Sequence, residues 1–150
     1  MLLFFVNGFP LLVCGLKSPS RYDTDASEAY TQLKKYMQCF PVLFNYNAFC
    51  VMSDMSISKA GTITANEDRF MGWKTTDGSY ESTQWADFTT FFEGIFERNR
   101  FIDILKNFIT FFNDFINKVK ILGAYHQYFA VNKPVNLTIK AIESDYECSE

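Results

Sequence analysis

The chain begins with an almost unbroken apolar run, MLLFFVNGFPLLVCGL, over residues 1–16. Asn7 and Gly8 stand in its middle, and this pair is a strong hairpin-turn signal because both residues tolerate a positive φ angle. The flanking segments Leu2–Val6 and Leu11–Cys14 are continuously apolar, as expected of strands in the centre of a covered sheet. The opening run therefore predicts a buried β-hairpin.

A secretory signal or a lipid anchor is the alternative interpretation of this run. A signal peptide needs a positive charge before its apolar stretch and a small residue at its cleavage site. The first basic residue is Lys17, after the run, and the bulky Val13 precedes Cys14. No stretch reaches the roughly 18 apolar residues of a membrane-spanning helix. The hairpin is therefore favoured over a secreted or lipid-anchored protein, and no membrane partner is expected.

Composition narrows the class of protein further. A chain of 150 residues with 48% hydrophobic residues fits one folded domain and excludes intrinsic disorder. The net charge of −3 argues against a wholly basic nucleic-acid-binding protein, although it leaves room for a local basic patch. The four cysteines lack C-x-x-C spacing and His126 is the only histidine, so neither forms a predicted metal site. We expect reduced core thiols and a cytoplasmic protein.

Hydrophobic periodicity predicts mixed helices and strands after the hairpin. Expected helices run from Asp25 or Ser27 to about Cys39, where Pro41 follows, then over 88–96, over 101–108, and from Tyr125 to about Ile142 with an interruption or kink at Pro134. Expected strands cover Phe49–Ser53, Ser58–Thr62, Ile109–Phe112 and Val119–Leu122, with a turn near Asn113 and Asp114. Polar residues 66–82 predict a surface loop with Trp73 as a packing anchor. The mixture indicates an α/β domain of mixed α+β character.

Charge is distributed unevenly along the second half of the chain. Residues 97–140 hold seven Lys or Arg and three acidic residues. The last ten residues hold four acidic residues and no basic one. Ordinary solvated faces are the favoured interpretation of both segments.

Several short segments together resemble a known family. Phe5-Val6-Asn7-Gly8, Pro10-Leu11 and Lys17 match a pattern that reads roughly D-x-x-x-F-V-N-G-x-P-L-x-x-x-E-x-K. Further matching segments, in family order, are QLKKY (32–36), LFNYNAF (43–49), VMSD (51–54), GTITANEDRFMGWKTTDG (61–78), ERNRFIDILKNFITF (97–111) and KILGAYHQYFAVNKPV (120–135). In this order they resemble the nuclease region of the R (restriction endonuclease) subunit of type I restriction-modification enzymes, which cleave unmodified foreign DNA during ATP-dependent translocation.

The resemblance implies a PD-(D/E)xK core, in which a central sheet is flanked by helices. In that family an aspartate and a glutamate on neighbouring strands hold Mg²⁺, which polarises the scissile phosphate. The motif lysine corresponds to Lys17 and stabilises developing charge. Gln32 and Tyr36 match a Q-x-x-x-Y pair one helical turn apart, which supports the site and contacts DNA. Lys17, Gln32 and Tyr36 are the catalytic candidates.

Two departures from the pattern affect this site. Alignment on Asn7-Gly8 and Lys17 places Gly15 where the family has its metal-binding glutamate, and places Met1 at or next to its aspartate. Both carboxylates are missing, and a lysine alone repels Mg²⁺. We therefore expect a truncated chain whose sheet is incomplete at its N-terminal edge. By itself it is expected to bind no metal and to lack nuclease activity.

The resemblance also divides the chain. Residues 1–124 are expected to form a partial nuclease domain, and residues 125–150 the start of a connection to a missing helicase-like ATPase domain. Gln127 resembles the adenine-reading glutamine of such ATPases and is a weak nucleotide-binding candidate. The phosphate-binding loop G-x-x-x-x-G-K-[ST] is absent from the sequence, so no ATP binding is expected.

The family further implies DNA and the modification (M) and specificity (S) subunits as partners. The alternative function is a non-catalytic DNA- or subunit-binding module. Such a module would grip the DNA backbone through side chains such as Lys17, Arg98, Arg100 and Lys106.

Overall fold

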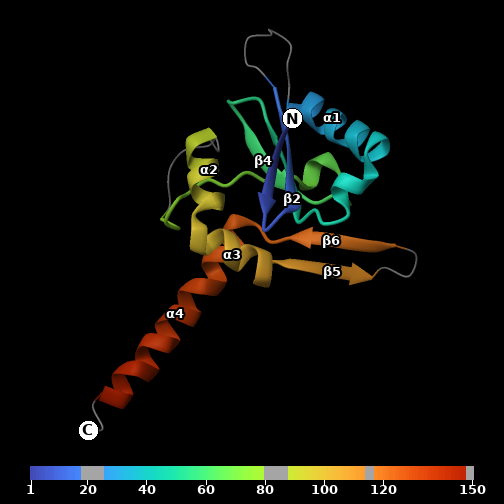
Figure 1. The fold of residues 1–150 in the computed structure, drawn as a ribbon. Helices are drawn as coiled ribbons and strands as arrows, with labels where there is room; N and C mark the ends of the chain where they lie inside the picture. Colours follow the sequence, from blue (N-terminus) through green and yellow to red (C-terminus); the bar gives the residue numbers. More distant parts are fainter. Residues whose placement is uncertain (18–25, 80–87, 114–116, 148–150) are drawn as a thin grey trace.

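The computed structural model of the protein describes residues 1–17, 26–79, 88–113 and 117–147. Its centre is a sheet of strand order β1-β2-β3-β4 (Figure 1). These strands are β1 (Leu2–Val6), β2 (Phe9–Leu16), β3 (Phe49–Ser53) and β4 (Ser58–Gly61). The β1–β2 and β3–β4 pairs are antiparallel, whereas β2 and β3 are parallel, so the sheet is mixed.

Helices cover both faces of this sheet. In Figure 1, α1 lies on one side and α2 on the other, and the β5–β6 hairpin and α4 extend from the lower end of the body. The remaining elements are α1 (Ala26–Cys39), the short helices η1 (Pro41–Phe44) and η2 (Glu67–Arg69), α2 (Phe88–Phe96), α3 (Arg98–Asn107), β5 (Ile109–Asn113), β6 (Lys118–Leu122) and α4 (Tyr125–Glu147).

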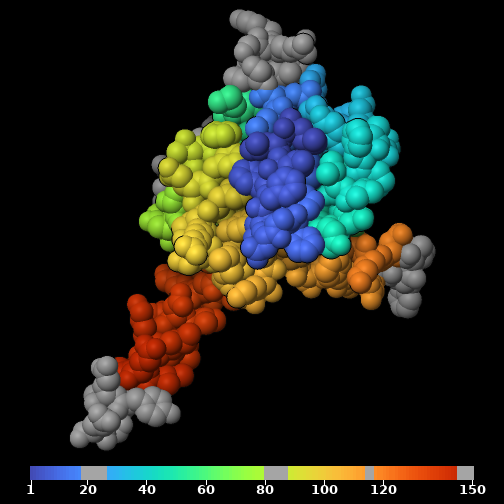
Figure 2. Space-filling model, viewed as in Figure 1, coloured from blue at the N-terminus to red at the C-terminus, as the bar shows by residue number. Residues whose placement is uncertain are grey.

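The predicted N-terminal hairpin is confirmed. β1 has the expected bounds, and β2 begins two residues earlier and ends two residues later than expected. Asn7 and Gly8 form the turn with φ angles of 51° and 84°, the conformation for which this pair is favoured. Figure 2 shows the hairpin on the near face of the body.

The continuous apolar strands follow from two cores, one on each face of the sheet. Along β2, Leu12 and Cys14 pack with α2 and α3, whereas Val13 packs with α1. Along β3, the first core receives Phe49 and Val51, and the second receives Cys50 and Met52. Because successive strand residues point to opposite faces, a strand covered on both sides needs apolar residues at every position.

The other predicted elements are confirmed to within a few residues, with two corrections. Residues 66–82 are not simply a surface loop, because Phe70, Trp73 and Thr75 are each only 3% exposed; Trp73 is the expected packing anchor. The last helix is not interrupted at Pro134 and continues to Glu147. The carbonyl that Pro134 leaves without a helical donor lies on an exposed stretch, where water can satisfy it.

Some predictions fall partly outside the described residues. These are the cap at Asp25, the turn residue Asp114, residues 80–82 of the polar segment and the thiol of Cys148. Cys14 and Cys50 are free and buried, as expected of core thiols, and burial raises the pKa of each to about 12. Cys39 is free but exposed, so it is not a core thiol.

Arg100 of α3 contacts α2, α4 and the segment around Trp73. Its Nη1 donates to the carbonyl of Gly94 at 2.5 Å and its Nη2 to that of Thr76 at 2.6 Å. The guanidinium also stacks within 6 Å of three aromatic rings, those of Trp73, Tyr128 and Phe129. One side chain of α3 therefore holds together α2, α4 and the segment around Trp73.

We expect Arg100→Met to lower the free energy of unfolding by about 2–3 kcal/mol, because it leaves two carbonyls without their donors. The matched control is Arg98→Met on the exposed side of the same helix, which should change stability by less than about 0.5 kcal/mol. Urea unfolding followed by circular dichroism measures both. Equal stability of the two variants would contradict the central role of Arg100.

Candidate functional site

A hollow of about 490 Å³ lies between the end of β2 and one face of α1, from Ser27 to Tyr36. It contains all three catalytic candidates, which the sequence separates by up to 19 positions. Its lining residues are Lys17, Ser27, Glu28, Thr31, Gln32, Lys35 and Tyr36. We call it the α1 pocket. Thr31 and Lys35 were not predicted; Lys35 lies three residues after Gln32 and four after Thr31, and residues three and four apart share a helix face.

Hydrogen bonds position the two sides of the α1 pocket. The backbone N–H of Lys17 donates to the carbonyl of Ser53 at 2.8 Å, which extends the β2–β3 pairing by one residue. On the helix, the Nε2 of Gln32 donates to the hydroxyl of Tyr36 at 2.6 Å. The Oε1 of Gln32 is buried and has no hydrogen-bond partner within the described part of the chain. Lys17 is therefore placed by its backbone pairing with β3, and Gln32 and Tyr36 are placed by their spacing on α1 and by the hydrogen bond between their side chains.

Contacts with the loop after β4 hold α1 in place. Tyr30 donates its hydroxyl hydrogen to the carbonyl of Ala65 at 3.2 Å. Lys34 donates to the carbonyls of Ile63 at 3.2 Å and Ala65 at 3.3 Å. The hydroxyl of Ser27 donates to Glu67. These bonds tie α1 to the segment that follows β4, so the helix that forms one side of the pocket is held in place.

Gly15 explains how closely α1 approaches β2. It lies on the same face of β2 as Val13 and Lys17, because strand side chains alternate. A Cβ atom at Gly15 would lie 3.1 Å from the carbonyl oxygen of Ala29 and 3.3 Å from the Cγ of Leu33. The space that a longer side chain would need is thus taken by α1 itself.

The carboxylates of the α1 pocket do not suit Mg²⁺. Glu28 is the one acidic side chain among the described residues that line it, and its Oε2 lies 3.5 Å from the Nζ of Lys17. Continuing the β1–β2 register beyond Leu2 and Cys14 places Met1 beside Gly15, so neither position supplies an oxygen ligand. Among the described residues no three His, Cys, Asp or Glu side chains form a metal-binding group. A hard divalent cation needs several oxygen ligands, and here it would also meet two ammonium groups.

Asp54 follows the neighbouring strand β3, and its carboxylate accepts hydrogen bonds from backbone N–H groups. Its Oδ1 accepts hydrogen bonds from the backbone N–H groups of Ser56 at 2.9 Å and Ile57 at 2.6 Å. This is the local turn geometry that aspartate commonly stabilises. Asp54 therefore shapes the β3–β4 turn and is not among the residues that line the α1 pocket.

Gln127 lies apart from the α1 pocket, at the start of α4. Its Oε1 accepts a hydrogen bond from the backbone N–H of Ala124 at 2.9 Å. A glutamine three residues after the cap position satisfies an otherwise unpaired N–H group at a helix start in this way. The side chain that resembles an adenine-reading glutamine thus has a structural task in this chain.

The predicted phosphate-contacting residues are not equivalent. Arg100 is committed to the carbonyls of Gly94 and Thr76 and to its aromatic neighbours, so its guanidinium is not available to the DNA backbone. Arg98 and Lys106 are exposed on α3. Lys17 faces the α1 pocket. Lys17, Arg98 and Lys106 therefore stay predictions as phosphate contacts, whereas the guanidinium of Arg100 already has partners within the fold.

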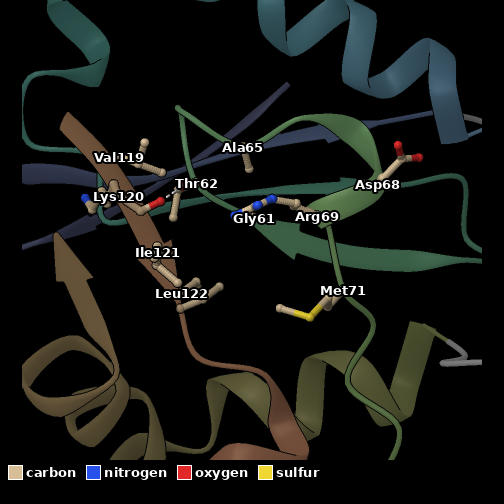
Figure 3. A pocket seen from close by; sticks show the side chains of 10 residues that line it. All are labelled: Gly61, Thr62, Ala65, Asp68, Arg69, Met71, Val119, Lys120, Ile121 and Leu122. Atoms are coloured by element: carbon tan, nitrogen blue, oxygen red, sulfur yellow. Dashed lines mark hydrogen bonds between the residues drawn. The ribbon is translucent and has the colours of Figure 1, made fainter. Parts of the chain in front are cut away.

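A second hollow, of about 290 Å³, lies between the segment after β4 and strand β6 (Figure 3). Met71, Val119 and Ile121 give it apolar walls, and Arg69 reaches toward its centre from η2. Thr62 donates its hydroxyl hydrogen to the carbonyl of Lys120 at 2.7 Å, which joins β6 to the body. This hollow contains none of the predicted site residues, so the α1 pocket is the candidate functional site.

We expect substitutions at Gly15 to destabilise the fold in proportion to their size. Gly15→Ala should cost about 1 kcal/mol and Gly15→Val about 2–3 kcal/mol, because the backbone of α1 must move away. Urea unfolding measures both values, and the two variants control for each other. An alanine variant as stable as the natural chain would show that α1 does not depend on the close approach.

The sequence is similar to those of known proteins. Residues 2–69 match a protein family described as Type I restriction enzyme R protein N terminus. Over 141 residues the chain is 33% identical to the Type I restriction enzyme HindI endonuclease subunit of Haemophilus influenzae, an alignment that covers 91% of this chain and 13% of that protein. The Putative type I restriction enzyme MjaIXP endonuclease subunit of Methanocaldococcus jannaschii is 28% identical over 158 residues, with 94% of this chain and 15% of that protein covered.

These alignments cover nearly the whole chain, but the chain spans at most 15% of the length of these two relatives. No helix in the described part of the chain combines the length and apolar character needed to cross a membrane. The matched family and the relatives agree with each other, and the family match includes the hairpin, Lys17, Gln32 and Tyr36. The chain thus matches the family of type I restriction enzyme R proteins over residues 2–69 and is similar over most of its length to a small part of two type I restriction enzyme endonuclease subunits.

Proposed function

We propose that the chain is a nuclease-like unit of a type I restriction endonuclease subunit that does not cleave DNA by itself. The observation that carries the proposal is the close approach of α1 to Gly15, because α1 occupies the space that the glutamate of the family pattern would need. Lys17, Gln32 and Tyr36 nevertheless line one pocket. The unit comprises residues 1–124 and has a PD-(D/E)xK core. The mixed sheet with helices on both faces supports this assignment.

The chemistry of the α1 pocket supports loss of cleavage and retention of anion binding. Lys17 and Lys35 contribute two positive charges, and the single carboxylate of Glu28 is paired with Lys17. Such a pocket repels a divalent cation but attracts a phosphate oxygen. In this proposal, Lys17 is a phosphate-facing residue, and Gln32 and Tyr36 form the wall that orients it.

The substrate class, partners and cofactors of the complete enzyme are proposed from the family. We propose that DNA is its substrate class in the complete enzyme and that modification and specificity subunits are its partners. Mg²⁺ and ATP are cofactors of that enzyme and are not held by this chain. The reduced, buried thiols of Cys14 and Cys50 support a cytoplasmic setting, where thiols stay unpaired.

We expect the purified chain to leave supercoiled plasmid DNA intact in the presence of Mg²⁺ or Mn²⁺. The physical reason is the missing oxygen ligands, without which no metal ion polarises the phosphate. Conversion of supercoiled to open-circular plasmid on an agarose gel measures nicking.

Lys17→Ala and Glu28→Gln, purified in parallel, are the matched controls. Trace contaminating nuclease would nick the plasmid equally in all three preparations. Nicking by the natural chain that disappears in either variant would contradict the proposal.

A second candidate function is non-catalytic binding of the DNA backbone. The presence of two lysines, Lys17 and Lys35, in the α1 pocket favours this function. We expect Lys17→Ala combined with Lys35→Ala to weaken duplex binding roughly tenfold in a low-salt gel shift, because two phosphate contacts are lost. Lys133→Ala combined with Lys140→Ala removes the same charge from α4 and should change the affinity less than twofold. No binding by the natural chain at low salt would exclude this function.

A further inference from the structure

The hollow between β6 and the segment after β4 has the composition of a small-ligand site, and we call it the β6 pocket. Its volume is about 290 Å³, roughly the space of ten water molecules. Met71 and Leu122 face each other across it, and Val119 and Ile121 extend the apolar wall along β6 (Figure 3). Small-ligand sites in proteins commonly combine such walls with a few polar groups that orient the ligand.

Arg69 provides the polar group of the β6 pocket. Its guanidinium reaches toward the centre of the pocket from η2 (Figure 3). Within the described part of the chain, this side chain has no hydrogen-bond acceptor and no carboxylate partner. A guanidinium can bind one carboxylate through two parallel hydrogen bonds, which fix its orientation as well as its position. The β6 pocket therefore offers a binding group that the fold itself does not use.

The other charged residues that line the β6 pocket direct their charges elsewhere. The ammonium group of Lys120 donates a hydrogen bond to the carbonyl of Asn47. The carboxylate of Asp68 projects away from the pocket, although Asp68 is next to Arg69 in the sequence (Figure 3). Among the described residues that line the pocket, Arg69 alone thus directs a charge into it.

We propose that the β6 pocket binds a small amphipathic carboxylate, an organic anion with one carboxylate group and an apolar body. The single guanidinium matches one carboxylate in charge and in shape, whereas a phosphate dianion would meet only one cation here. The apolar body would cover Met71, Ile121 and their neighbours, which removes apolar surface from water. The volume fits a ligand of about ten heavy atoms, if each takes roughly the space of one water molecule.

Such a ligand would contact both the body and the β5–β6 hairpin. The hairpin is joined to the body beside the pocket, because Thr62 donates to the carbonyl of Lys120 at 2.7 Å and the backbone N–H of Lys120 donates to Thr64 at 2.9 Å. A ligand between Arg69 and β6 adds a further link of the same kind. Binding is therefore expected to stabilise the native chain, because the unfolded chain has no such pocket.

Octanoate fills this volume and is the probe that tests the proposal. We expect it to bind the full chain with a Kd on the order of 1 mM, as is usual for a ligand of this size. Titration followed by ¹⁵N–¹H correlation spectra should move the amide signals of residues 61–71 and 119–122. Octylammonium has the same apolar body with the opposite charge, and acetate has the carboxylate alone. Each should bind roughly tenfold more weakly or not at all, because each lacks one of the two contacts.

The variant that tests the assignment to Arg69 is Arg69→Gln, in which we expect the Kd for octanoate to rise roughly tenfold or more. Arg98→Gln is the matched control, because it removes the same charge from an exposed position on α3 outside the β6 pocket. Its Kd should change less than twofold. The amide signals outside the pocket show in the same spectra that each variant is folded.

Three results would overturn the proposal. The first is the absence of signal shifts at residues 61–71 and 119–122 with octanoate up to about 20 mM, well above the expected Kd. The second is equal binding of octanoate and octylammonium, which would indicate an apolar contact without recognition of the carboxylate. The third is an equal loss of affinity in Arg69→Gln and Arg98→Gln, which would indicate a general effect of net charge.

Discussion

The close contact between β2 and α1 at Gly15 determines the arrangement of the candidate site. A Cβ at this position would lie 3.1 Å from the carbonyl oxygen of Ala29, so the helix rests directly on the strand. Because α1 is this close, Lys17, two residues further along the same face, opens into the same hollow as Gln32 and Tyr36. The contact that assembles the pocket is thus also the one that leaves no room for a longer side chain at position 15.

Much of the fold follows from local chemistry. The Asn7-Gly8 turn, the doubly covered strands and the helices with aromatic stripes are set by φ preference and side-chain alternation, which act over a few residues. The burial of part of residues 66–79 could not be predicted, because it depends on Trp73 packing against Gly94, where a Cβ would lie 2.1 Å from its ring. The role of Arg100 likewise depends on α2 and α4 meeting around it.

The candidate site was predictable only in part. Lys17, Gln32 and Tyr36 follow from the family pattern, and the helical spacing of Gln32 and Tyr36 indicates one face. The pairing of Glu28 with Lys17 depends on the angle at which α1 crosses β2, which no local pattern contains. Gln127 shows the converse, since its side chain caps α4 at Ala124 although its sequence context resembles a nucleotide-binding motif. A residue that keeps its place in a motif can therefore have another task.

We propose that the α1 pocket retains the arrangement of a nuclease site without its metal. Titration of the full chain with Mn²⁺, followed by electron paramagnetic resonance of the free ion, tests it most directly, because Mn²⁺ accepts the same oxygen ligands as Mg²⁺. We expect no stoichiometric binding of Mn²⁺ by the natural chain, and the same Mn²⁺ titration for the natural chain and for Glu28→Gln. One Mn²⁺ bound per chain, released in Glu28→Gln or bound more tightly in Lys17→Ala, would contradict it.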